Sequence, residues 1–272
     1  MNVALALQQA RIEIPLSEAR LLLQHVLSCA HADLVAHPER LLAPEAAETF
    51  NALTARRARG EPIAYLTGSR EFYGRSFSVT PAVLIPRPET ELLVILALEK
   101  MRDMKAPRIL DLGTGSGVLA ITLMLELPRA GITAVDHSLE ALAIARTNAA
   151  RLGARVRWMQ SDWLSALHDE CFDLIVANPP YVAVADPHLH QGDLRFEPQQ
   201  ALISGGDGLD DIRRIIGAAP AHLDSGGWLL FEHGYDQAQY CRTLLASAGF
   251  NQAASWRDLA QIERVSGGMN LD

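Results

Sequence analysis

The part of this sequence best suited to chemistry is the tetrapeptide Asn178-Pro179-Pro180-Tyr181. The Asn178 side-chain oxygen and the Pro179 carbonyl are two acceptors that can hold both N–H bonds of a planar –NH₂ group. Such a nitrogen is a poor nucleophile because its lone pair is delocalised, and holding it in this way leaves the lone pair free to attack. Pro180 stiffens the loop, and Tyr181 offers a flat apolar face. The pattern predicts a site that activates an amide or an aromatic amine.

The elements that must position this loop form an alternating series. The tetrapeptide follows the apolar run 172–177, which predicts a buried strand whose carboxyl end is a place where ligands bind in open α/β sheets. The predicted strands are Arg108–Leu112, Ile132–Asp136, Val156–Gln160, Phe172–Ala177, Trp228–Glu232, Ser255–Asp258 and Arg264–Asn270. The predicted helices between them span 117–127, 138–152, 208–223 and 236–248. This alternation predicts an α/β fold with a seven-stranded, mostly parallel sheet in which one strand near the C-terminus is antiparallel.

A glycine-rich loop follows the first of these strands. It consists of Gly113, Thr114, Gly115, Ser116 and Gly117. Glycines there permit a tight turn and a close approach of a ligand to the backbone, and the free N–H groups of the next helix attract anions. The residue that follows is valine, where the dinucleotide-binding fingerprint has its third glycine, which disfavours a pyrophosphate-binding NAD site.

Acidic and aromatic side chains follow the next two strands. Asp136 ends the second strand, where a carboxylate can accept from both hydroxyls of a ribose. Asp162 and Trp163 follow the third, where they can accept from an exocyclic amine and cover a base. One aspartate at a strand end is usually an ordinary cap. Three successive strand ends that carry a glycine-rich loop, an Asp and an Asp-Trp pair indicate a nucleoside with an amino-acid-like tail, S-adenosylmethionine. This set resembles the class I methyltransferases, which implies a Rossmann-like sheet and S-adenosylhomocysteine as product.

The residues before the sheet have a different pattern. Residues 1–70 predict a small helical domain in which Ser17 caps a helix and Pro44 begins another. This domain is either a plain helical bundle or a partner-binding domain, and the sequence leaves both interpretations open. Residues 71–86 predict a β-hairpin connector around Gly74, and residues 87–272 the methyltransferase domain.

Several motifs together make the resemblance more specific. They are Gly60–Gly68 (GEPIAYLTG), Ile85–Glu91 (IPRPETE), Asp111–Gly117, Asn178–Tyr181, Glu197–Leu202 and Gly205–Leu209. This set resembles the release-factor glutamine methyltransferases, the PrmC/HemK family. The resemblance implies transfer of a methyl group to the side-chain amide nitrogen (N5) of the glutamine in the Gly-Gly-Gln motif of class I peptide-chain release factors, which modulates translation termination. It further implies that residues 113–117 contact the cofactor together with Asp136, Trp163 and Asn178, and that 178–181 hold the glutamine. Glu89 replaces the commoner Asp of the family's Pro-Arg-Pro motif, and Arg87, Glu89 and Thr90 either line the pocket or brace the hinge.

The charge distribution separates the rival functions. The net charge is −8, and residues 91–272 carry all of it, because the nine Arg of residues 1–90 are balanced by nine acidic residues. An acidic catalytic half disfavours a DNA adenine N6-methyltransferase, which needs a positive groove for nucleic acid. A glutamine methyltransferase of a ribosomal protein stays open as a closer alternative. A non-catalytic cofactor-binding module is disfavoured because the tetrapeptide is complete.

The remaining features predict the setting of the protein. Three widely separated cysteines, Cys29, Cys171 and Cys241, indicate a reducing compartment, and we expect a cytoplasmic monomer without a membrane segment. His188 and His190 have no further ligand cluster nearby, so we expect no metal. Residues 182–200 are polar and predict a loop over the acceptor pocket that orders when the partner protein docks.

Overall fold

The computed structural model describes residues 1–271, which divide into two compact units. The first unit contains Met1–Ser69 together with Pro187–Phe196. The second contains Arg70–Asp186 and residues 197–271. Within residues 1–271, no helix is long and apolar enough to cross a lipid bilayer.

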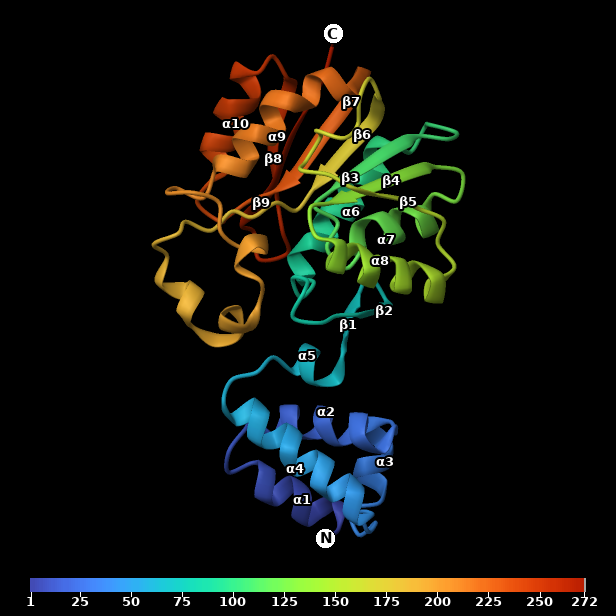
Figure 1. Cartoon of the computed structure of the whole chain (residues 1–272), viewed down its shortest axis with the longest axis vertical. Coiled ribbons are helices and arrows are strands. Elements are labelled where there is room, and N and C mark those ends of the chain that lie inside the picture. Colours follow the sequence, from blue (N-terminus) through green and yellow to red (C-terminus); the bar gives the residue numbers. More distant parts are fainter. Residues whose placement is uncertain (272) are drawn as a thin grey trace. The chain divides into compact units, whose positions relative to one another are not determined.

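The first unit is built on short helices (Figure 1). They are α1 (Val3–Ala10), α2 (Leu16–Leu27), α3 (His31–Ala36), α4 (Pro44–Ala58) and α5 (Ile63–Thr67). Leu22, Leu23 and Phe50 are fully buried in their common core. Pro44 occupies the first helical position of α4, as predicted, because its missing N–H has no partner there in any case. The predicted cap was wrong: Ser17 lies inside α2, which begins one residue earlier after Pro15.

Residues 187–196 reach the first unit from a distant part of the sequence. They form the 3₁₀ turns η2 (Pro187–His190) and η3 (Gly192–Phe196). Arg57, near the end of α4, donates to Asp193 at 3.0 Å and to both carboxylate oxygens of Glu18, at 2.7 and 2.9 Å. One guanidinium therefore joins three segments of this unit.

A β-hairpin opens the second unit. It pairs β1 (Ser69–Phe72) with β2 (Arg75–Ser78), and both turn residues, Tyr73 and Gly74, have positive φ of 50° and 70°. Positive φ at both positions matches the twist of a tight hairpin. Asn148 fixes the hairpin by accepting from the Ser78 N–H at 2.7 Å and donating to the Ser78 carbonyl at 3.0 Å.

Within residues 1–271, the second unit contains a seven-stranded sheet. In spatial order its strands are β5 (Arg157–Gln160), β4 (Gly131–Asp136), β3 (Arg108–Leu112), β6 (Phe172–Ala177), β7 (Leu223–Glu232), β9 (Glu263–Met269) and β8 (Asn251–Arg257). The first five are parallel, and β9 runs antiparallel to β7 and β8. The prediction of seven mostly parallel strands is confirmed. β7 begins five residues earlier than predicted because its polar first half still pairs with β6, through Leu223 and Phe172.

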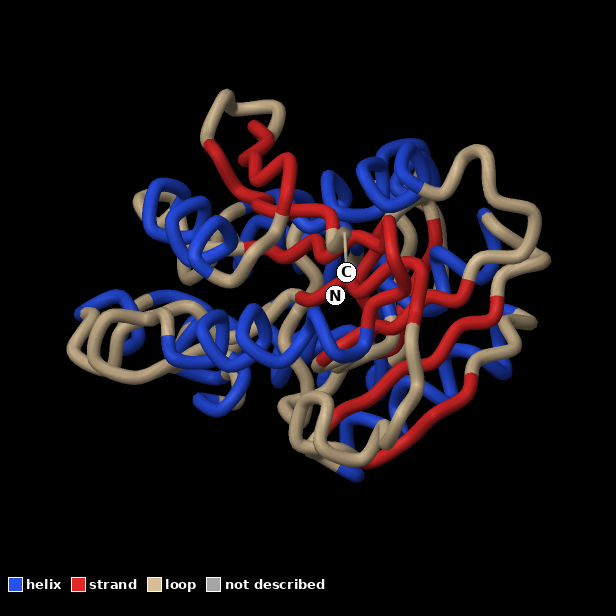
Figure 2. The backbone as a smooth tube through the Cα atoms, turned by 90° about the horizontal axis from the view of Figure 1, so that it is seen from above, coloured by secondary structure: helices blue, strands red, loops and turns tan. Residues whose placement is uncertain are grey.

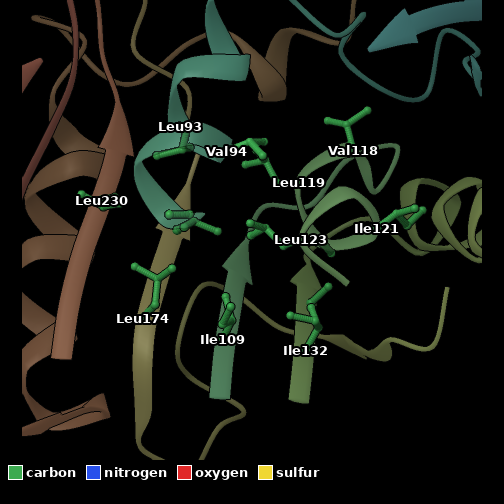
Figure 3. Packing of buried hydrophobic residues seen from close by; sticks show 14 of the residues in the cluster. Leu93, Val94, Ile109, Val118, Leu119, Ile121, Leu123, Ile132, Leu174 and Leu230 are labelled. Atoms are coloured by element: carbon green, nitrogen blue, oxygen red, sulfur yellow. The ribbon is translucent and has the colours of Figure 1, made fainter. Parts of the chain in front are cut away.

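Helices cover both faces of this sheet, which lies between them in Figure 2. One group consists of α6 (Glu91–Lys100), α7 (Val118–Glu126) and α8 (Leu139–Leu152). The other consists of α9 (Asp210–Ala218) and α10 (Ala238–Ser247). The 3₁₀ turn η1 (Pro88–Thr90) precedes α6, and η4 (Gln199–Ala201) and η5 (Ala219–His222) lie in the loops. Successive side chains of a strand point alternately to the two helix layers: Ile109 packs with α6 and α7, and Leu110 with α9 and α10. Figure 3 shows the first of these cores, with Leu93 of α6 and Leu119 of α7 above the sheet.

The order of the strands defines where a ligand can bind. From β3 the chain builds outwards to β4 and β5, and then returns to place β6 and β7 on the other side of β3. The carboxyl ends of β3 and β6 therefore lie side by side, with Leu112 paired to Ala177. Crevices in open α/β sheets form at such a reversal of strand order.

Candidate active site

A pocket of about 250 Å³ opens at this edge of the sheet, entirely within the second unit. Many of the predicted site residues line it, namely Gly113, Thr114, Gly115, Ser116, Asp136, Asp162, Trp163, Asn178 and Pro180. Gly117, Pro179 and Tyr181 are not among the described residues that line it. Three strand ends and the loop after the fourth thus meet in one cavity, as the shared edge of a parallel sheet requires.

The glycine-rich loop turns sharply between β3 and α7. Gly113, Gly115 and Gly117 have φ of 69°, 55° and 84°, a region that other residues enter only with strain. A Cβ on Gly117 would lie 2.9 Å from Ile121 Cδ1, so this glycine allows close packing beneath the loop. A Cβ on Gly115 would meet nothing within 4 Å, so this position faces open space.

Asp111 holds the loop from below. Its Oδ2 atom accepts from the Thr114 hydroxyl at 2.6 Å and from the N–H of Ala120 at 3.2 Å, so it ties the loop to the start of α7. The carboxyl is fully buried, and burial raises its pKa to about 7. The sequence reasoning placed Asp111 in a motif without giving it a role, although an acidic residue inside an apolar strand is a visible signal.

Asp136 is positioned by backbone donors at the end of β4. Its two carboxylate oxygens accept from the N–H of Gly115 at 2.8 Å and from the N–H of Ser138 at 2.9 Å. Burial raises the pKa of Asp136. A carboxylate has about four acceptor sites, so this one can still accept from a further donor at the pocket wall.

Trp163 and Asp162 are held by residues of α9 that the sequence reasoning did not select. The Trp163 indole N–H donates to Asp211 Oδ1 at 3.0 Å, and its ring would lie 3.2 Å from a Cβ on Gly113. Asp162, whose side chain is half exposed, accepts from Arg214 at 2.7 Å. Asp162 is therefore already paired with a cation, whereas the Trp163 ring forms a flat wall beside the loop.

The tetrapeptide presents its asparagine to the pocket and turns its tyrosine away. Asn178 Nδ2 donates to the Thr90 hydroxyl at 3.2 Å. Asn178 Oδ1 is buried and has no hydrogen-bond partner among residues 1–271. The Tyr181 hydroxyl donates to Glu232 at 3.0 Å, and the negative charge of Glu232 raises the pKa of Tyr181. The free oxygen of Asn178 is thus an unused acceptor at the end of β6.

The Pro-Arg-Pro segment is tied to the chain beyond the tetrapeptide. Arg87 forms an ion pair with Glu197, whose buried carboxylate also accepts from the Ile85 N–H at 2.9 Å. Thr90 lines the pocket, whereas Arg87 and Glu89 are not among its described lining residues. Arg87 therefore braces the segment, and Thr90 belongs to the cavity wall.

Comparison with solved structures shows which class of fold this is. A methyltransferase from Pyrococcus furiosus matches 82% of this chain and 100% of its own, with a TM-score of 0.55 at 16% identity. A 16S rRNA N2 G1207 methyltransferase of T. thermophilus, solved with AdoMet and guanosine, matches 74% of this chain and 49% of its own, with a TM-score of 0.57 at 20% identity. Residues 90–249, more than half of the chain, match the family model described as "Methyltransferase small domain". The chain is a methyltransferase.

The relatives identify the family within this class. Residues 2–68 match the family model described as "PrmC N-terminal domain". Proteins named release factor glutamine methyltransferase are similar over most of the chain: 52% identity in Bordetella pertussis, over 94% of this chain and 95% of the relative, and 44% in Escherichia coli, over 93% and 92%. The chain belongs to the family of release factor glutamine methyltransferases, which confirms the resemblance noted in the sequence.

Proposed function

We propose that the chain transfers a methyl group from S-adenosylmethionine to N5 of the glutamine in the Gly-Gly-Gln motif of class I peptide-chain release factors. The names of the relatives support a release factor as substrate. The observation that carries the proposal within this chain is the unpartnered, buried Oδ1 of Asn178, a residue that lines the pocket. An acceptor left without a donor in a buried place is costly unless a ligand supplies the donor.

The residues of the pocket fit this cofactor. The loop at Gly113 and Gly115 leaves room for a ligand against the backbone, the Asp136 carboxylate can accept from ribose hydroxyls, and the Trp163 ring offers a flat wall to a base. When bound, S-adenosylmethionine would supply a methyl carbon on a positively charged sulfur, so that forming the N–C bond and breaking the S–C bond yields S-adenosylhomocysteine and a proton.

The tetrapeptide would hold the acceptor nitrogen. Asn178 Oδ1 and the Pro179 carbonyl accept its two N–H bonds, which orients the lone pair towards the methyl carbon. Asn178 and Pro179 carry no charge, so they align the amide without acting as a base. Oriented approach of this kind can lower a barrier by about 7–11 kcal/mol at best. Pro180 and Tyr181 would keep the loop rigid, Pro180 through its fixed φ and Tyr181 through its bond to Glu232.

Incubation with cofactor labelled in the methyl group tests the substrate. The acceptors are a recombinant class I release factor, the same protein with the glutamine of Gly-Gly-Gln replaced by alanine, total ribosomal proteins, and duplex DNA. We expect label on the intact release factor and none on its alanine variant. Label on a ribosomal protein or on adenine, with an unlabelled release factor, would refute the proposal.

The partner is inferred to be a protein and not a nucleic acid, in keeping with the net negative charge of residues 91–272. A translation factor as substrate supports a cytoplasmic enzyme, and we infer a monomer. Light scattering of the purified protein at several concentrations tests the oligomeric state, and a mass that doubles with concentration would contradict the monomer.

A further inference from the structure

A buried chain of hydrogen bonds runs from Asn178 away from the pocket. Asn178 Nδ2 donates to Thr90 Oγ1 at 3.2 Å, and the Thr90 hydroxyl donates to Glu232 Oε2 at 2.6 Å. The other oxygen of Glu232 accepts from the Tyr181 hydroxyl at 3.0 Å. These groups come from η1, the loop after β6 and the end of β7, and Thr90 and Glu232 are 2% and 1% exposed. No step of the proposed reaction uses Thr90 or Glu232 directly.

The direction of each of these hydrogen bonds follows from the Glu232 carboxylate. While Glu232 is ionised, its carboxylate can only accept, so both hydroxyl protons point at it. Burial raises the pKa of Glu232, and the two hydroxyl donors and the nearby positive charge of Arg264 oppose part of that rise. With its single proton committed to Glu232, the Thr90 oxygen can only accept from Asn178.

This polarity decides which end of the Asn178 amide faces a substrate. The Nδ2 end must turn to Thr90, which leaves Oδ1 as the end without a partner among the described residues. If the amide were flipped, two donors would meet when a substrate –NH₂ group entered, and the Thr90 oxygen would lose its donor. An amide has no intrinsic preference between the two orientations, so something outside the tetrapeptide must impose one.

We propose that Glu232, acting through Thr90, is a positioning residue that sets the orientation of the Asn178 amide and so makes its oxygen the acceptor for the substrate amide. The inference deepens the proposed function and rests on it for the identity of the substrate. The strand register supports it, because β6 and β7 are parallel neighbours with Ala177 paired to Phe231, so Asn178 and Glu232 follow at the same level.

The hydrogen-bonded series Glu232–Thr90–Asn178 is called the relay below. It is tested with the variants Thr90→Val, Thr90→Ser and Glu232→Gln. Thr90→Val removes the hydroxyl with little change in shape, and Thr90→Ser restores it. Glu232→Gln keeps the shape but introduces an N–H donor, which can reverse the polarity of the Thr90 hydroxyl. The matched control is Thr122→Val, because Thr122 is also fully buried in the second unit and its hydroxyl has no partner among residues 1–271.

The first measurement does not depend on the substrate. In protein labelled with ¹⁵N-asparagine, the side-chain NH₂ signals of Asn178 are assigned by their loss in Asn178→Ala. We expect these signals to move in Thr90→Val and Glu232→Gln and to stay in place in Thr90→Ser and Thr122→Val. Unchanged Asn178 signals in both Thr90→Val and Glu232→Gln would overturn the proposal. Where one of these two variants does not fold, the other decides.

The second measurement is methyl transfer to the release factor under saturating cofactor. We expect kcat to fall about 100-fold in Thr90→Val, the size of effect that misplacement of a reacting group by ~1 Å produces. We expect Thr90→Ser to restore most of it, and the Kd for S-adenosylhomocysteine to stay within about threefold of wild type, as for an interaction outside cofactor binding. Full turnover in Thr90→Val despite moved signals would also overturn the proposal. If the wild type leaves the release factor unlabelled while the signals respond as expected, the proposed substrate is wrong and the relay stands.

Discussion

Replacing Asp136 by alanine is expected to abolish most of the binding of S-adenosylmethionine while leaving the fold in place. Asp136 lines the pocket from the end of β4, and both of its oxygens are already aligned by the N–H groups of Gly115 and Ser138, at 2.8 and 2.9 Å. A carboxylate aligned in this way has lost little freedom when it meets the two hydroxyls of a ribose. Alanine removes both acceptors at once.

The size of the effect follows from the bonds that are lost. A hydrogen bond to a charged group contributes about 1.5–3 kcal/mol, so two such bonds contribute about 3–6 kcal/mol. Because 1.4 kcal/mol is a factor of ten, the Kd should rise by ~10² to ~10⁴. We expect the lower part of this range, since water can replace the carboxylate in part. Binding should also weaken as the pH falls through the raised pKa of Asp136, because the neutral acid accepts less strongly.

Isothermal titration calorimetry with S-adenosylhomocysteine measures this Kd without turnover. The matched control is Asp162→Ala, because Asp162 also lines the pocket but its half-exposed carboxylate is paired with Arg214 at 2.7 Å. We expect the control to lose less than about fivefold, the limit for a screened and already paired surface charge. A thermal melt of each variant without ligand confirms that the fold is intact. Equal losses in the two variants, or an unchanged Kd in Asp136→Ala, would refute the reasoning.

The other predictions concern the acceptor, the glycine loop and the buried acid. Asn178→Ala should lower kcat by about 10² to 10³, the usual loss for one preorganised hydrogen-bonding group. Its Kd for S-adenosylhomocysteine, measured by calorimetry, should be nearly unchanged. Cofactor binding lost in step with turnover would instead make Asn178 primarily a cofactor-binding residue. Gly115→Ala and Gly117→Ala share the strain of positive φ, worth about 1–2 kcal/mol, but only Gly117→Ala also meets Ile121 Cδ1 at 2.9 Å. Gly117→Ala should therefore cost a further ~1–3 kcal/mol in urea unfolding, and equal costs would contradict the packing argument. Asp111, with a folded pKa of about 7 against 3.8 unfolded, contributes stability below pH ~4 that is lost as the pH rises through 7. Asp111→Asn should thus gain on wild type by up to ~4 kcal/mol between pH ~4 and ~8, and a difference that is constant with pH would contradict this assignment.

The sequence determined the architecture of the second unit because that architecture is written in local patterns. Parallel strands covered on both faces are near-continuous apolar runs, and such runs predicted β3 and β6 to the residue, at 108–112 and 172–177. The carboxyl ends of parallel strands share one edge, so the polar residues that end these runs had to gather there. The pocket lining confirms that Gly113, Asp136 and Asn178 meet.

The ends of some helices differ from the prediction, because neighbouring residues compete to begin or end a helix. The Ser17 cap was wrong because the helix begins at Leu16, with Pro15 at the N-cap position and no side-chain cap hydrogen bond. The predicted helix 208–223 ends earlier, at Ala218, and continues as the 3₁₀ turn η5, because Pro220 interrupts the helical hydrogen bonds. Boundaries of this kind depend on small energy differences between neighbouring residues.

Tertiary structure alone decided what surrounds the tetrapeptide. Thr90 is 88 residues from its hydrogen-bond partner Asn178 and 142 residues from its partner Glu232. No periodicity or spacing in the sequence connects positions so distant. The same holds for the loop 182–200, of which residues 187–196 belong to the first unit while Gln200 lines the pocket of the second. The sequence thus determined which side chains stand at the edge of the sheet, because burial shapes each strand locally. Which atom of Asn178 is left to meet a substrate depends on hydrogen-bond partners that only the folded chain brings within reach.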